Sequence, residues 1–408
     1  MAHMLSAVAA VAVLIAAPAT AQDMPRGLKL DRVVMVMRHG VRPPTKAPAM
    51  PAGVAAEAWP DWPVKPGYLT PNGAAAVKRV ASSDRARFVA ARLLPARGCS
   101  GTVRIVADSD QRTIATAQAW ADALVPGCAT PIAHKPQGES DALFSPIDEG
   151  LATLDPARAD AAVAAAAGPG GIAAQEARVR PILSRLDAIL CGTATQRCGI
   201  GAEPSGLVPA NTRKRPKLTG ALDRGSTVAQ ILLLEYADGK PMRDVGWGRA
   251  TAADIARASE LHALEFALLA RPPYLARANL AGLAPVIAAA LSDRTATAPA
   301  ITMISGHDTN VASLGGLLDG HWQVPGFAAD DPTPGGAIVL ERLTDGRGQT
   351  YVRAVYRSLT IEQTRASTPS RHGSQPYRSV MPIAGCAARG VQGLCTEAAF
   401  LRVLSARE

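Results

Sequence analysis

One short segment constrains the fold more than any other part of this chain. Residues 33–37 (Val-Val-Met-Val-Met) form an apolar run rich in β-branched side chains, with no polar interruption. Such a run is typical of a strand that is buried on both faces of a sheet. Similar runs predict further strands at 102–107, 300–304, 337–340 and 350–356. A sheet of this kind needs helices on both faces, so we predict an α/β fold.

Helical patterns alternate with these strands and then replace them. Thr70-Pro71 has the form of an N-cap followed by proline at the first helical position, and the helix should extend to about residue 94. Further helices are expected at 112–124, 228–236 and 255–270. Between 141 and 291 the strand-like runs disappear. We therefore predict a mixed central sheet with flanking helices, formed by residues 22–140 and 292–408, and a smaller inserted α-helical domain at 141–291.

The first residues predict the compartment. Residues 5–17 are an apolar, alanine-rich run too short for a comfortable membrane span, and Ala19-Thr20-Ala21 is a small-x-small cleavage signature. We predict a signal peptide at 1–21 and a periplasmic or secreted protein, although no Lys or Arg precedes the run; a buried N-terminal helix is the alternative. No later segment is long and apolar enough for a transmembrane helix, so no membrane association is expected after cleavage.

The cysteines fit export. The six can be paired in fifteen ways, but they fall into three pairs that are close in sequence. Disulfides are the default in an oxidising compartment, whereas a zinc site would need a ligand spacing such as C-x2-C, which does not occur here. We therefore expect disulfides, and proximity in sequence favours Cys99–Cys128, Cys191–Cys198 and Cys386–Cys395.

The charge balance points to anionic partners without choosing among them. The chain has 43 Lys and Arg residues against 34 Asp and Glu residues, a formal net charge of +9. A polyphosphorylated small molecule fits this surplus as well as a nucleic acid, and a solvated basic surface fits too. The charge is spread along the chain, not gathered in a basic tail. Neither a heptad pattern nor an apolar stripe is visible, so a monomer is expected.

The strongest chemical signal directly follows the run at 33–37. It is R-H-G-V-R-P-P at 38–44, in which two arginines flank a histidine. Guanidinium groups bind phosphate oxygens in a bidentate manner and stay charged at any working pH. Their charge lowers the pKa of a histidine between them, and a neutral imidazole is a nucleophile. The pattern predicts that Arg38 and Arg42 hold a phosphoryl group while His39 attacks its phosphorus; a strand-end histidine beside two surface arginines is the alternative.

A second motif, S-G-H-D-T-N at 305–310, follows the strand predicted at 300–304. Sites in α/β proteins form beyond the carboxyl ends of the strands, so both histidines should face one crevice. His307 can donate a hydrogen bond to a phosphate oxygen. Asp308 can protonate the leaving alkoxide, provided that it is protonated when the substrate binds. Taken alone, Asp308 and Thr309 also fit a helix N-cap.

A third motif, D-Q-R-T at 110–113, follows the strand predicted at 102–107. Arg112 would lie at the start of a helix, where backbone N–H groups and the helix dipole also favour an anion. It is a candidate third arginine of a phosphate pocket, and an arginine on a solvated helix end is the alternative. We expect His134, His262 and His321 to be structural.

Together these motifs resemble those of the histidine acid phosphatases, above all their bacterial periplasmic phytase branch. The resemblance spans almost all of the mature chain. It includes R-H-G-V-R-P-P-T-K at 38–46, L-T-P-N-G at 69–73, D-Q-R-T at 110–113, G-W-G-R at 246–249, G-H-D-T-N at 306–310, P-G-G-A at 334–337 and A-G-C…G-L-C at 384–395. It implies an α/β domain with a smaller α domain, and activity without a metal or organic cofactor. It also implies disulfides at the three cysteine pairs.

The resemblance also implies roles for individual residues. His39 matches the nucleophile that becomes a phosphohistidine, and Asp308 matches the proton donor to the leaving group. The residues that cradle the phosphate match Arg38, Arg42, Arg112 and His307. Positions that contact substrate in phytases match Thr45 and Lys46.

Two departures from the family pattern concern substrate choice. Phytase relatives carry a pocket-facing carboxylate where Gln230 stands, so Gln230 is a further candidate for substrate contact. A basic residue for distal phosphates is replaced at Asn279, with Arg277 close by. The H-D-T-N form at 307–310 favours phytase over the sugar-phosphatase branch, whereas these two substitutions argue against strict phytate specificity.

We therefore predict hydrolysis of phosphomonoesters, with phytate (myo-inositol hexakisphosphate) as the substrate and no nucleic-acid partner. A glucose-1-phosphatase or a broad-specificity periplasmic acid phosphatase on the same fold is the alternative. A mutase-type phosphoryl transferase shares the R-H-G motif, but export and the His-Asp pair argue against it. A non-catalytic polyanion-binding protein would keep the basic pocket, but it has no need for both His39 and Asp308.

Overall fold

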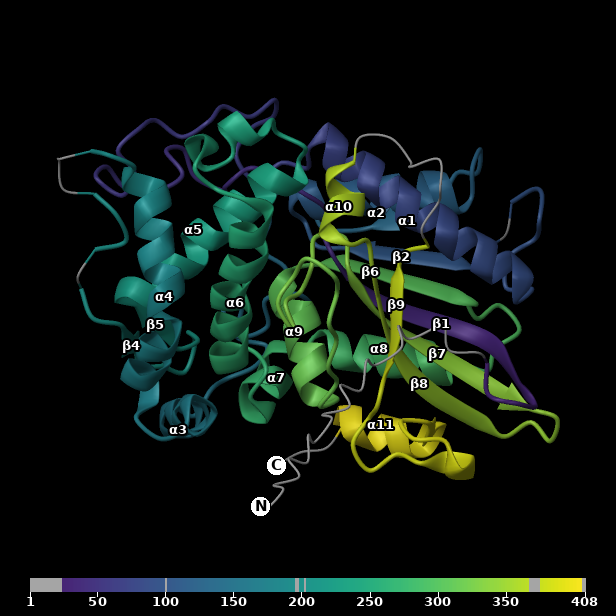
Figure 1. Ribbon diagram of the computed structural model, residues 1–408. Coiled ribbons are helices and arrows are strands. Elements are labelled where there is room, and N and C mark those ends of the chain that lie inside the picture. Colours follow the sequence, from purple (N-terminus) through teal and green to yellow (C-terminus); the bar gives the residue numbers. More distant parts are fainter. Residues whose placement is uncertain (1–23, 100, 195–197, 202, 367–374, 406–408) are drawn as a thin grey trace, which may run out of the picture.

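A mixed eight-stranded sheet forms the centre of the molecule (Figure 1). The computed structural model describes residues 24–99, 101–194, 198–201, 203–366 and 375–405, so the expected signal peptide at 1–21 lies outside the described part. The strands are β1 (Leu28–Arg38), β2 (Val103–Ala107), β3 (Ile132–Ala133), β6 (Ile301–Gly306), β7 (Ala337–Asp345), β8 (Thr350–Ser358), β9 (Tyr377–Met381) and β10 (Cys395–Thr396). Their order is β10-β8-β7-β1-β6-β2-β3, with β9 paired to β8.

Strand β1 lies at the centre of this sheet and is buried on both faces. It pairs in parallel with β6 and antiparallel with β7, and β6 pairs in parallel with β2. Val33, Met35 and Met37 belong to one apolar cluster, with α1 (Pro71–Ala90) and α2 (Gln111–Leu124). Val34 and Val36 belong to the other, with α8 (Leu283–Ser292), α9 (Asp308–Leu317) and α11 (Glu397–Ser405). The mixed sheet between two helical layers confirms the predicted fold class.

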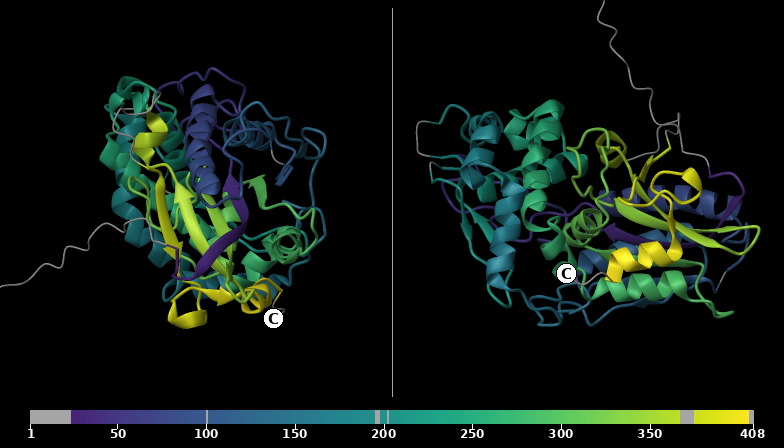
Figure 2. Two further views of the ribbon diagram at one scale, coloured as in Figure 1. Left: turned by 90° about the vertical axis from the view of Figure 1, so that its right-hand side faces the viewer. Right: turned by 90° about the horizontal axis from the view of Figure 1, so that it is seen from below.

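A group of helices lies beside the sheet, at the left of Figure 1, and the right-hand view in Figure 2 shows the same separation. It contains α3 (Pro156–Ala167), α4 (Gly171–Cys191), α5 (Gly220–Ala237), α6 (Ala252–Leu269) and α7 (Pro273–Asn279). The expectation that 141–291 holds no strand is wrong, because β4 (Gly206–Val208) and β5 (Lys217–Thr219) form a short antiparallel hairpin there. The boundaries at 141 and 291 stay a prediction.

Helix α8 falls within the predicted insertion but packs on the sheet, where Arg32 Nη1 donates to the Ala290 carbonyl at 2.8 Å. Helix α10 (Ile361–Arg365) follows β8 and lies near α1. Within the described ranges no single helix is long and apolar enough to cross a membrane. Helices α7 and α8 reach that length and composition only as a pair bent by 78°.

Helix α1 begins as the sequence predicts. Thr70 Oγ1 accepts a hydrogen bond from the Gly73 N–H at 2.9 Å, and Pro71 occupies the first helical position. A Cβ atom on Gly73 would lie 2.5 Å from the Val41 carbonyl oxygen, so only glycine allows the helix to approach the chain this closely. The contact fixes the backbone just after His39.

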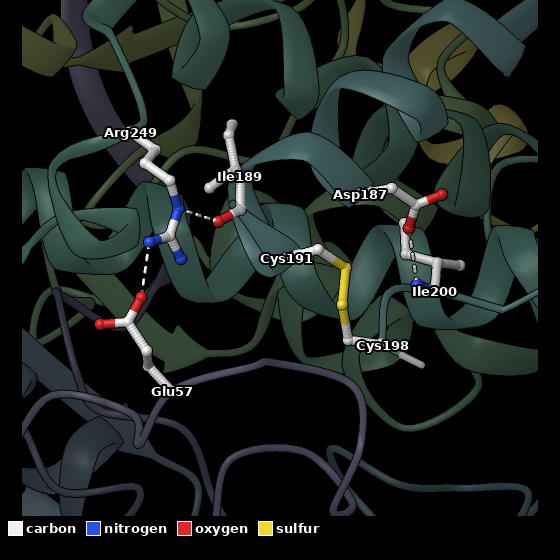
Figure 3. Close-up of a disulfide and its surroundings, with 7 residues drawn as sticks. All are labelled: Glu57, Asp187, Ile189, Cys191, Cys198, Ile200 and Arg249. Atoms are coloured by element: carbon white, nitrogen blue, oxygen red, sulfur yellow. Dashed lines mark hydrogen bonds and ion pairs between the residues drawn. A yellow bond between two sulfur atoms is a disulfide. The ribbon is translucent and has the colours of Figure 1, made fainter. Parts of the chain in front are cut away.

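The proline-rich segment, residues 43–71, leaves the sheet edge and docks on the helices. The Ala56 N–H donates to the Leu190 carbonyl at 3.1 Å, and the Trp59 and Trp247 rings lie 5.0 Å apart. Glu57 forms an ion pair with Arg249 beside the disulfide at the end of α4 (Figure 3). The segment then returns to the sheet, where the Thr70 N–H donates to the Val41 carbonyl.

Three disulfides join the cysteines that are close in sequence. The Cα–Cα distances are 5.5, 5.8 and 4.6 Å for Cys99–Cys128, Cys191–Cys198 and Cys386–Cys395. All six cysteines are therefore used within the chain.

Candidate active site

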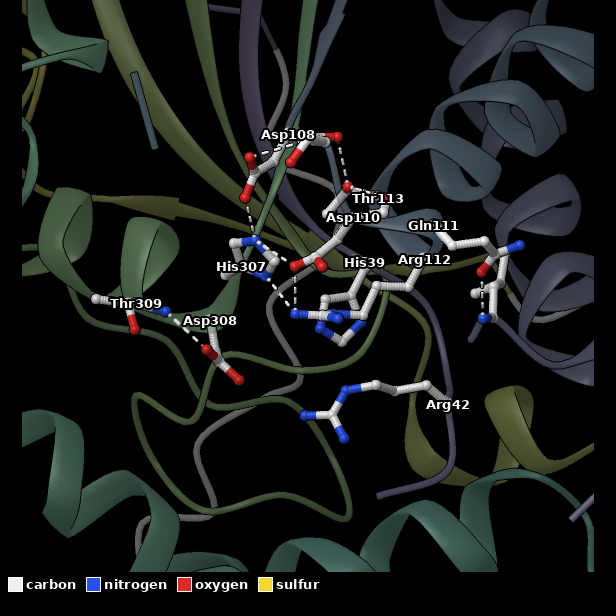
Figure 4. Close-up of polar contacts among 12 residues, drawn as sticks. His39, Arg42, Asp108, Asp110, Gln111, Arg112, Thr113, His307, Asp308 and Thr309 are labelled. Atoms are coloured by element: carbon white, nitrogen blue, oxygen red, sulfur yellow. Dashed lines mark hydrogen bonds and ion pairs between the residues drawn. The ribbon is translucent and has the colours of Figure 1, made fainter. Parts of the chain in front are cut away.

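Three polar clusters meet at the carboxyl edge of the sheet, because β1, β6 and β2 run parallel and end side by side. Strand β1 ends at Arg38 and His39, β6 leads into His307 and Asp308, and β2 leads to Arg112. The ring centroids of His39 and His307 lie 5.7 Å apart (Figure 4). The three motifs singled out in the sequence therefore form one site.

His39 is buried, and its hydrogen bond defines which ring nitrogen is free. Nδ1 lies 2.8 Å from the Gly40 carbonyl oxygen. A carbonyl only accepts, so in the neutral ring the proton sits on Nδ1 and the lone pair on Nε2. Burial lowers the pKa of His39 well below its usual value, and three neighbouring arginines lower it further. The ring is therefore a neutral nucleophile even in mild acid.

Arg38 connects the sheet to the helices. Its Nη1 donates to the Pro332 carbonyl, and its Nη2 lies 2.8 Å from Gln230 Oε1 in α5. The same Nη2 lies 3.1 Å from Asp308 Oδ2 at the start of α9. Arg38 is almost fully buried, so the Asp308 carboxylate balances its charge. This arrangement brings Gln230 to the site.

Arg42 has no carboxylate partner among the described residues. Its Nη1 donates to the Pro43 carbonyl at 3.0 Å, and its buried Nε has no hydrogen-bond partner. Burial, together with the charges of Arg112 and Arg38, lowers the pKa of Arg42 to about 10, so it remains a cation at working pH. Its guanidinium points toward Asp308 and Arg112 in Figure 4. This partly buried charge has no carboxylate partner among the described residues, and a bound anion would neutralise it.

His307 is held by carboxylates that follow β2. Its Nε2 lies 2.6 Å from Asp108 Oδ2 and 3.5 Å from Asp110 Oδ2. Its Nδ1 lies 3.5 Å from Nη2 of Arg112, which in turn forms a 2.6 Å ion pair with Asp110. Asp108 therefore orients the ring beside the phosphate-binding arginine. The sequence does carry a signal for Asp108, because it directly follows the last residue of β2.

Asp108, Asp110 and His307 also have potential ligand atoms that all lie within 4.8 Å of one another. The guanidinium of Arg112 already lies 2.6 Å from Asp110, so a metal ion there would meet a positive charge. The two carboxylates therefore serve to orient His307 and Arg112, and this arrangement does not suit a metal ion.

Asp308 is the first residue of α9, and its carboxylate faces Arg38. His307 is the N-cap of this helix, so the alternative reading of Asp308 as the N-cap is wrong. Burial alone would raise the pKa of Asp308, but the charge of Arg38, followed by that of His262, outweighs burial and holds the pKa below its usual value. Asp308 is thus ionised when the site is empty. It must gain a proton as an anionic substrate arrives if it is to act as a donor.

Sequence reasoning missed His262, which we expected to be structural. This buried histidine of α6 has Nδ1 2.6 Å from Asp331 Oδ1 and Nε2 3.9 Å from Asp308 Oδ2. It lines the large cavity, whereas His134 and His321 line neither cavity of the site. No local motif marks His262, because its neighbours in sequence show only helical periodicity.

A cavity of about 1150 Å³ reaches from the sheet edge to α5 and α6. Thr45, Lys46 and Gln230, the three candidates for substrate contact, all line it. A second cavity of about 300 Å³ is lined by Arg112 and His307. Asp308 lines both, and Arg42 lines the large one. The two cavities therefore adjoin at the phosphate-binding cluster, which we define as Arg38, Arg42, Arg112 and His307.

Asn279 lines the smaller cavity. The sequence predicted that Asn279 replaces a basic residue that phytase relatives use for distal phosphates. Arg277 does not replace that residue. Its Nη1 donates to the Val403 carbonyl of α11 at 3.4 Å, and it lines neither cavity.

Comparisons with known proteins match this geometry. The family model of the histidine phosphatase superfamily (branch 2) matches residues 29–357. The chain is 36% identical to phytase AppA of Escherichia coli (strain K12), over 95% of this chain and 94% of that protein. It is 30% identical to a glucose-1-phosphatase of Salmonella typhimurium, over 94% of each. The structure of Hafnia alvei phytase in complex with tartrate superposes with a TM-score of 0.85 at 33% identity, covering 94% of this chain and 98% of that one.

Proposed function

The chain belongs to the histidine phosphatase superfamily, branch 2, and is a phosphatase; from its site we propose a metal-independent acid phosphatase that uses His39 as nucleophile and phytate as substrate. One observation carries this proposal. A buried, neutral histidine with its Nε2 lone pair free is ringed by three arginines, one of which has no carboxylate partner in the described structure.

In the first proposed step Nε2 of His39 attacks the phosphorus. The N–P bond forms, and the P–O bond to the leaving group breaks. Arg42 and Arg112 stabilise charge on the non-bridging oxygens, and the Gly40 carbonyl stabilises the ring as it becomes positive. Asp308 gives its proton to the departing oxygen.

In the second step Asp308, now a carboxylate, takes a proton from a water molecule. The water oxygen attacks the phosphorus, the N–P bond breaks, and inorganic phosphate leaves. His39 returns to its neutral form with the proton still on Nδ1. Asp308 holds this proton while phosphate is bound and releases it to solvent once the phosphate has left, because Arg38 keeps the carboxyl ionised in the empty site.

The charges of the site explain why acid should be needed. The negative charge of a bound phosphate offsets that of Arg38, so it moves the pKa of Asp308 back up toward its usual value. A phosphate monoester below its second pKa of about 6 also brings a proton of its own. Above that pH neither the substrate nor Asp308 supplies the proton.

Several features support phytate over a small sugar phosphate. The large cavity, at about 1150 Å³, exceeds the usual range of about 300–1,000 Å³ for ligand pockets, and Lys46 lines it. Two of the similar proteins are phytases. Neutral Gln230 and Asn279 favour the alternative of a glucose-1-phosphatase or a broad-specificity phosphatase.

We also propose export to the periplasm or medium and a monomeric state. The three disulfides support an oxidising compartment. No nucleic acid is needed as a partner, because a small phosphate ester satisfies the cationic pocket.

Release of inorganic phosphate from phytate and from glucose 1-phosphate tests the proposal, at about pH 4.5 with a chelator present. Wild type is compared with His39→Ala and, as matched control, with His134→Ala, an exposed histidine outside the cavities. We expect release from phytate that is lost only in His39→Ala. Release from glucose 1-phosphate alone keeps the mechanism and favours the alternative substrate. Full activity of His39→Ala overturns the mechanism, and no release from either substrate by wild type favours a polyanion-binding protein.

A further inference from the structure

A basic hairpin forms part of the wall of the large cavity, and none of the steps above uses it. We define the basic hairpin as residues 211–217, which comprise most of the turn after β4 and the first residue of β5. Lys214, Arg215 and Lys217 all line the cavity. Arg213 is used elsewhere, because its Nη2 donates to the Asp148 carbonyl at 3.1 Å. Three cations of the basic hairpin therefore face the space where a substrate would lie.

The turn is held in place before any ligand arrives. Asn211 and Lys214 exchange backbone hydrogen bonds of 3.0 and 3.3 Å, and Asn211 Oδ1 accepts from the Arg213 N–H at 2.9 Å. The Thr212 carbonyl accepts from the Leu154 N–H at 3.1 Å, which ties the tip to the chain before α3. An ordered turn of this kind loses less entropy on binding than a mobile loop does.

The charges of the basic hairpin are only loosely compensated. Arg215 lies 3.9 Å from Asp148, and Lys217 lies 3.9 Å from Asp223. In the described part of the chain, Lys214 has no carboxylate within ion-pair distance. All three side chains are exposed to the cavity and solvent, so they can move onto a phosphate oxygen with shorter and stronger contacts.

Arg215 connects the basic hairpin to the phosphate-binding cluster. It lines both cavities, as Asp308 does. Arg112 and Arg215 are the two cations among the described residues that line the smaller cavity, where Asn279 contributes no charge. An ester with one phosphate at His39 would leave the basic hairpin empty. A ring that carries several phosphates has groups left over to reach it.

We propose that the basic hairpin binds phosphate groups that are not being cleaved, and so selects compact rings with several phosphates over esters with one. The inference rests on the proposed function and names the structural element that would bind the further phosphates of its substrate. Long-range attraction from three cations should also speed the encounter with a polyanion, an effect that salt screens.

The test removes the three charges together. The triple variant Lys214→Gln, Arg215→Gln, Lys217→Gln is compared with a control triple variant, Arg26→Gln, Lys29→Gln, Arg347→Gln. The control loses the same charge from exposed positions at the opposite end of β1 and in the β7–β8 turn. kcat/KM is measured for phytate and for p-nitrophenyl phosphate, which carries one phosphate, at low and high salt.

We expect the hairpin variant to lose about tenfold in kcat/KM for phytate at low salt, less at high salt, and under about twofold for p-nitrophenyl phosphate. The unchanged p-nitrophenyl phosphate activity shows that the variant folds. An equal loss of kcat/KM for phytate in the hairpin and control variants overturns the inference. An equal loss of kcat/KM for phytate and p-nitrophenyl phosphate in the hairpin variant also overturns it. Absence of p-nitrophenyl phosphate hydrolysis in wild type is a different result, because it overturns the phosphatase function itself.

Binding provides a readout that needs no turnover. In a His39→Ala background, titration calorimetry with myo-inositol hexakis sulfate should show weaker binding only when the hairpin charges are removed. Unchanged affinity in that variant counts against the basic hairpin as a phosphate-binding element.

Discussion

Replacement of Asp308 by asparagine separates proton donation from phosphate binding. Asparagine keeps the size of the side chain and an oxygen that can accept from the Thr309 N–H, as Oδ1 now does at 2.9 Å. Arg38 keeps the Pro332 carbonyl and Gln230 as partners, so the phosphate pocket should persist. The substitution removes the proton that Asp308 would donate to the leaving group. A general acid contributes typically about 10²–10⁴-fold in rate, which corresponds to about 3–5 kcal/mol of transition-state stabilisation.

The leaving group provides the assay. With glycerol 2-phosphate the leaving group is the glycerol alkoxide, which needs a proton, whereas the p-nitrophenolate released from p-nitrophenyl phosphate is stable without one. We expect kcat of Asp308→Asn to fall by about 10²–10⁴-fold on glycerol 2-phosphate and by less than about tenfold on p-nitrophenyl phosphate. Asp148→Asn makes the same change in the wall of the same cavity, without contact with Arg38, and should leave both rates nearly unchanged. Equal losses on the two substrates would refute the role of Asp308 as donor.

Two further predictions follow from perturbed pKa values. Because the pKa of His39 lies well below 6.5, kcat/KM should show no acidic limb centred near 6.5, and Arg42→Gln, which removes a neighbouring positive charge, should move the acidic limb to higher pH. A limb near 6.5 in wild type contradicts the neutral nucleophile. Glu341 is buried among three arginines that outweigh burial and lower its pKa from 4.5 to about 2, so it adds stability above pH 4.5 that is lost toward pH 2. In urea unfolding, Glu341→Gln should lower the free energy of unfolding by about 3 kcal/mol at neutral pH and by less at about pH 3. Equal decreases at the two pH values would contradict a contribution from the lowered pKa of Glu341.

Strand direction alone brings together the three motifs from which the sequence predicted the site. His39, Arg112 and His307 each lie within five residues after an apolar run that reads as a strand. Parallel pairing places the three strand ends at one edge, so no knowledge of the loops was needed. The pairing of Arg38 with Asp308 follows from the same geometry.

Strand direction does not predict the helical contribution to the site. Gln230 of α5 was a candidate only through the family resemblance, and His262 was missed. His262 reaches Asp308 only because α6 packs near α9, and nothing in its neighbourhood in sequence reports that packing. The basic hairpin looks like a solvated loop in the sequence, since β4 and β5 have three residues each and are too short to show alternation.

Errors at the ends of elements have local causes. Helix α1 ends at Ala90 and not near residue 94, because Arg92 adopts a left-handed conformation with φ of 62° that its side chain does not signal. Strand β1 begins at Leu28, ahead of the apolar run. There buried Leu28 and Leu30 alternate with exposed Lys29 while the strand pairs with β7.

The route of the proline-rich segment affects how the cavity responds to heating. Its ends are fixed to the sheet edge around Val41, while its middle is fixed to the helices through Ala56 and Glu57. Thr45 and Lys46 lie between these two attachments, whereas His39 is held by the sheet and by α1 and α2, which pack on it. Warming that loosens the helices beside the sheet should therefore widen the cavity while the strand ends keep their register. Selectivity among phosphate esters should be lost at a lower temperature than hydrolytic activity itself.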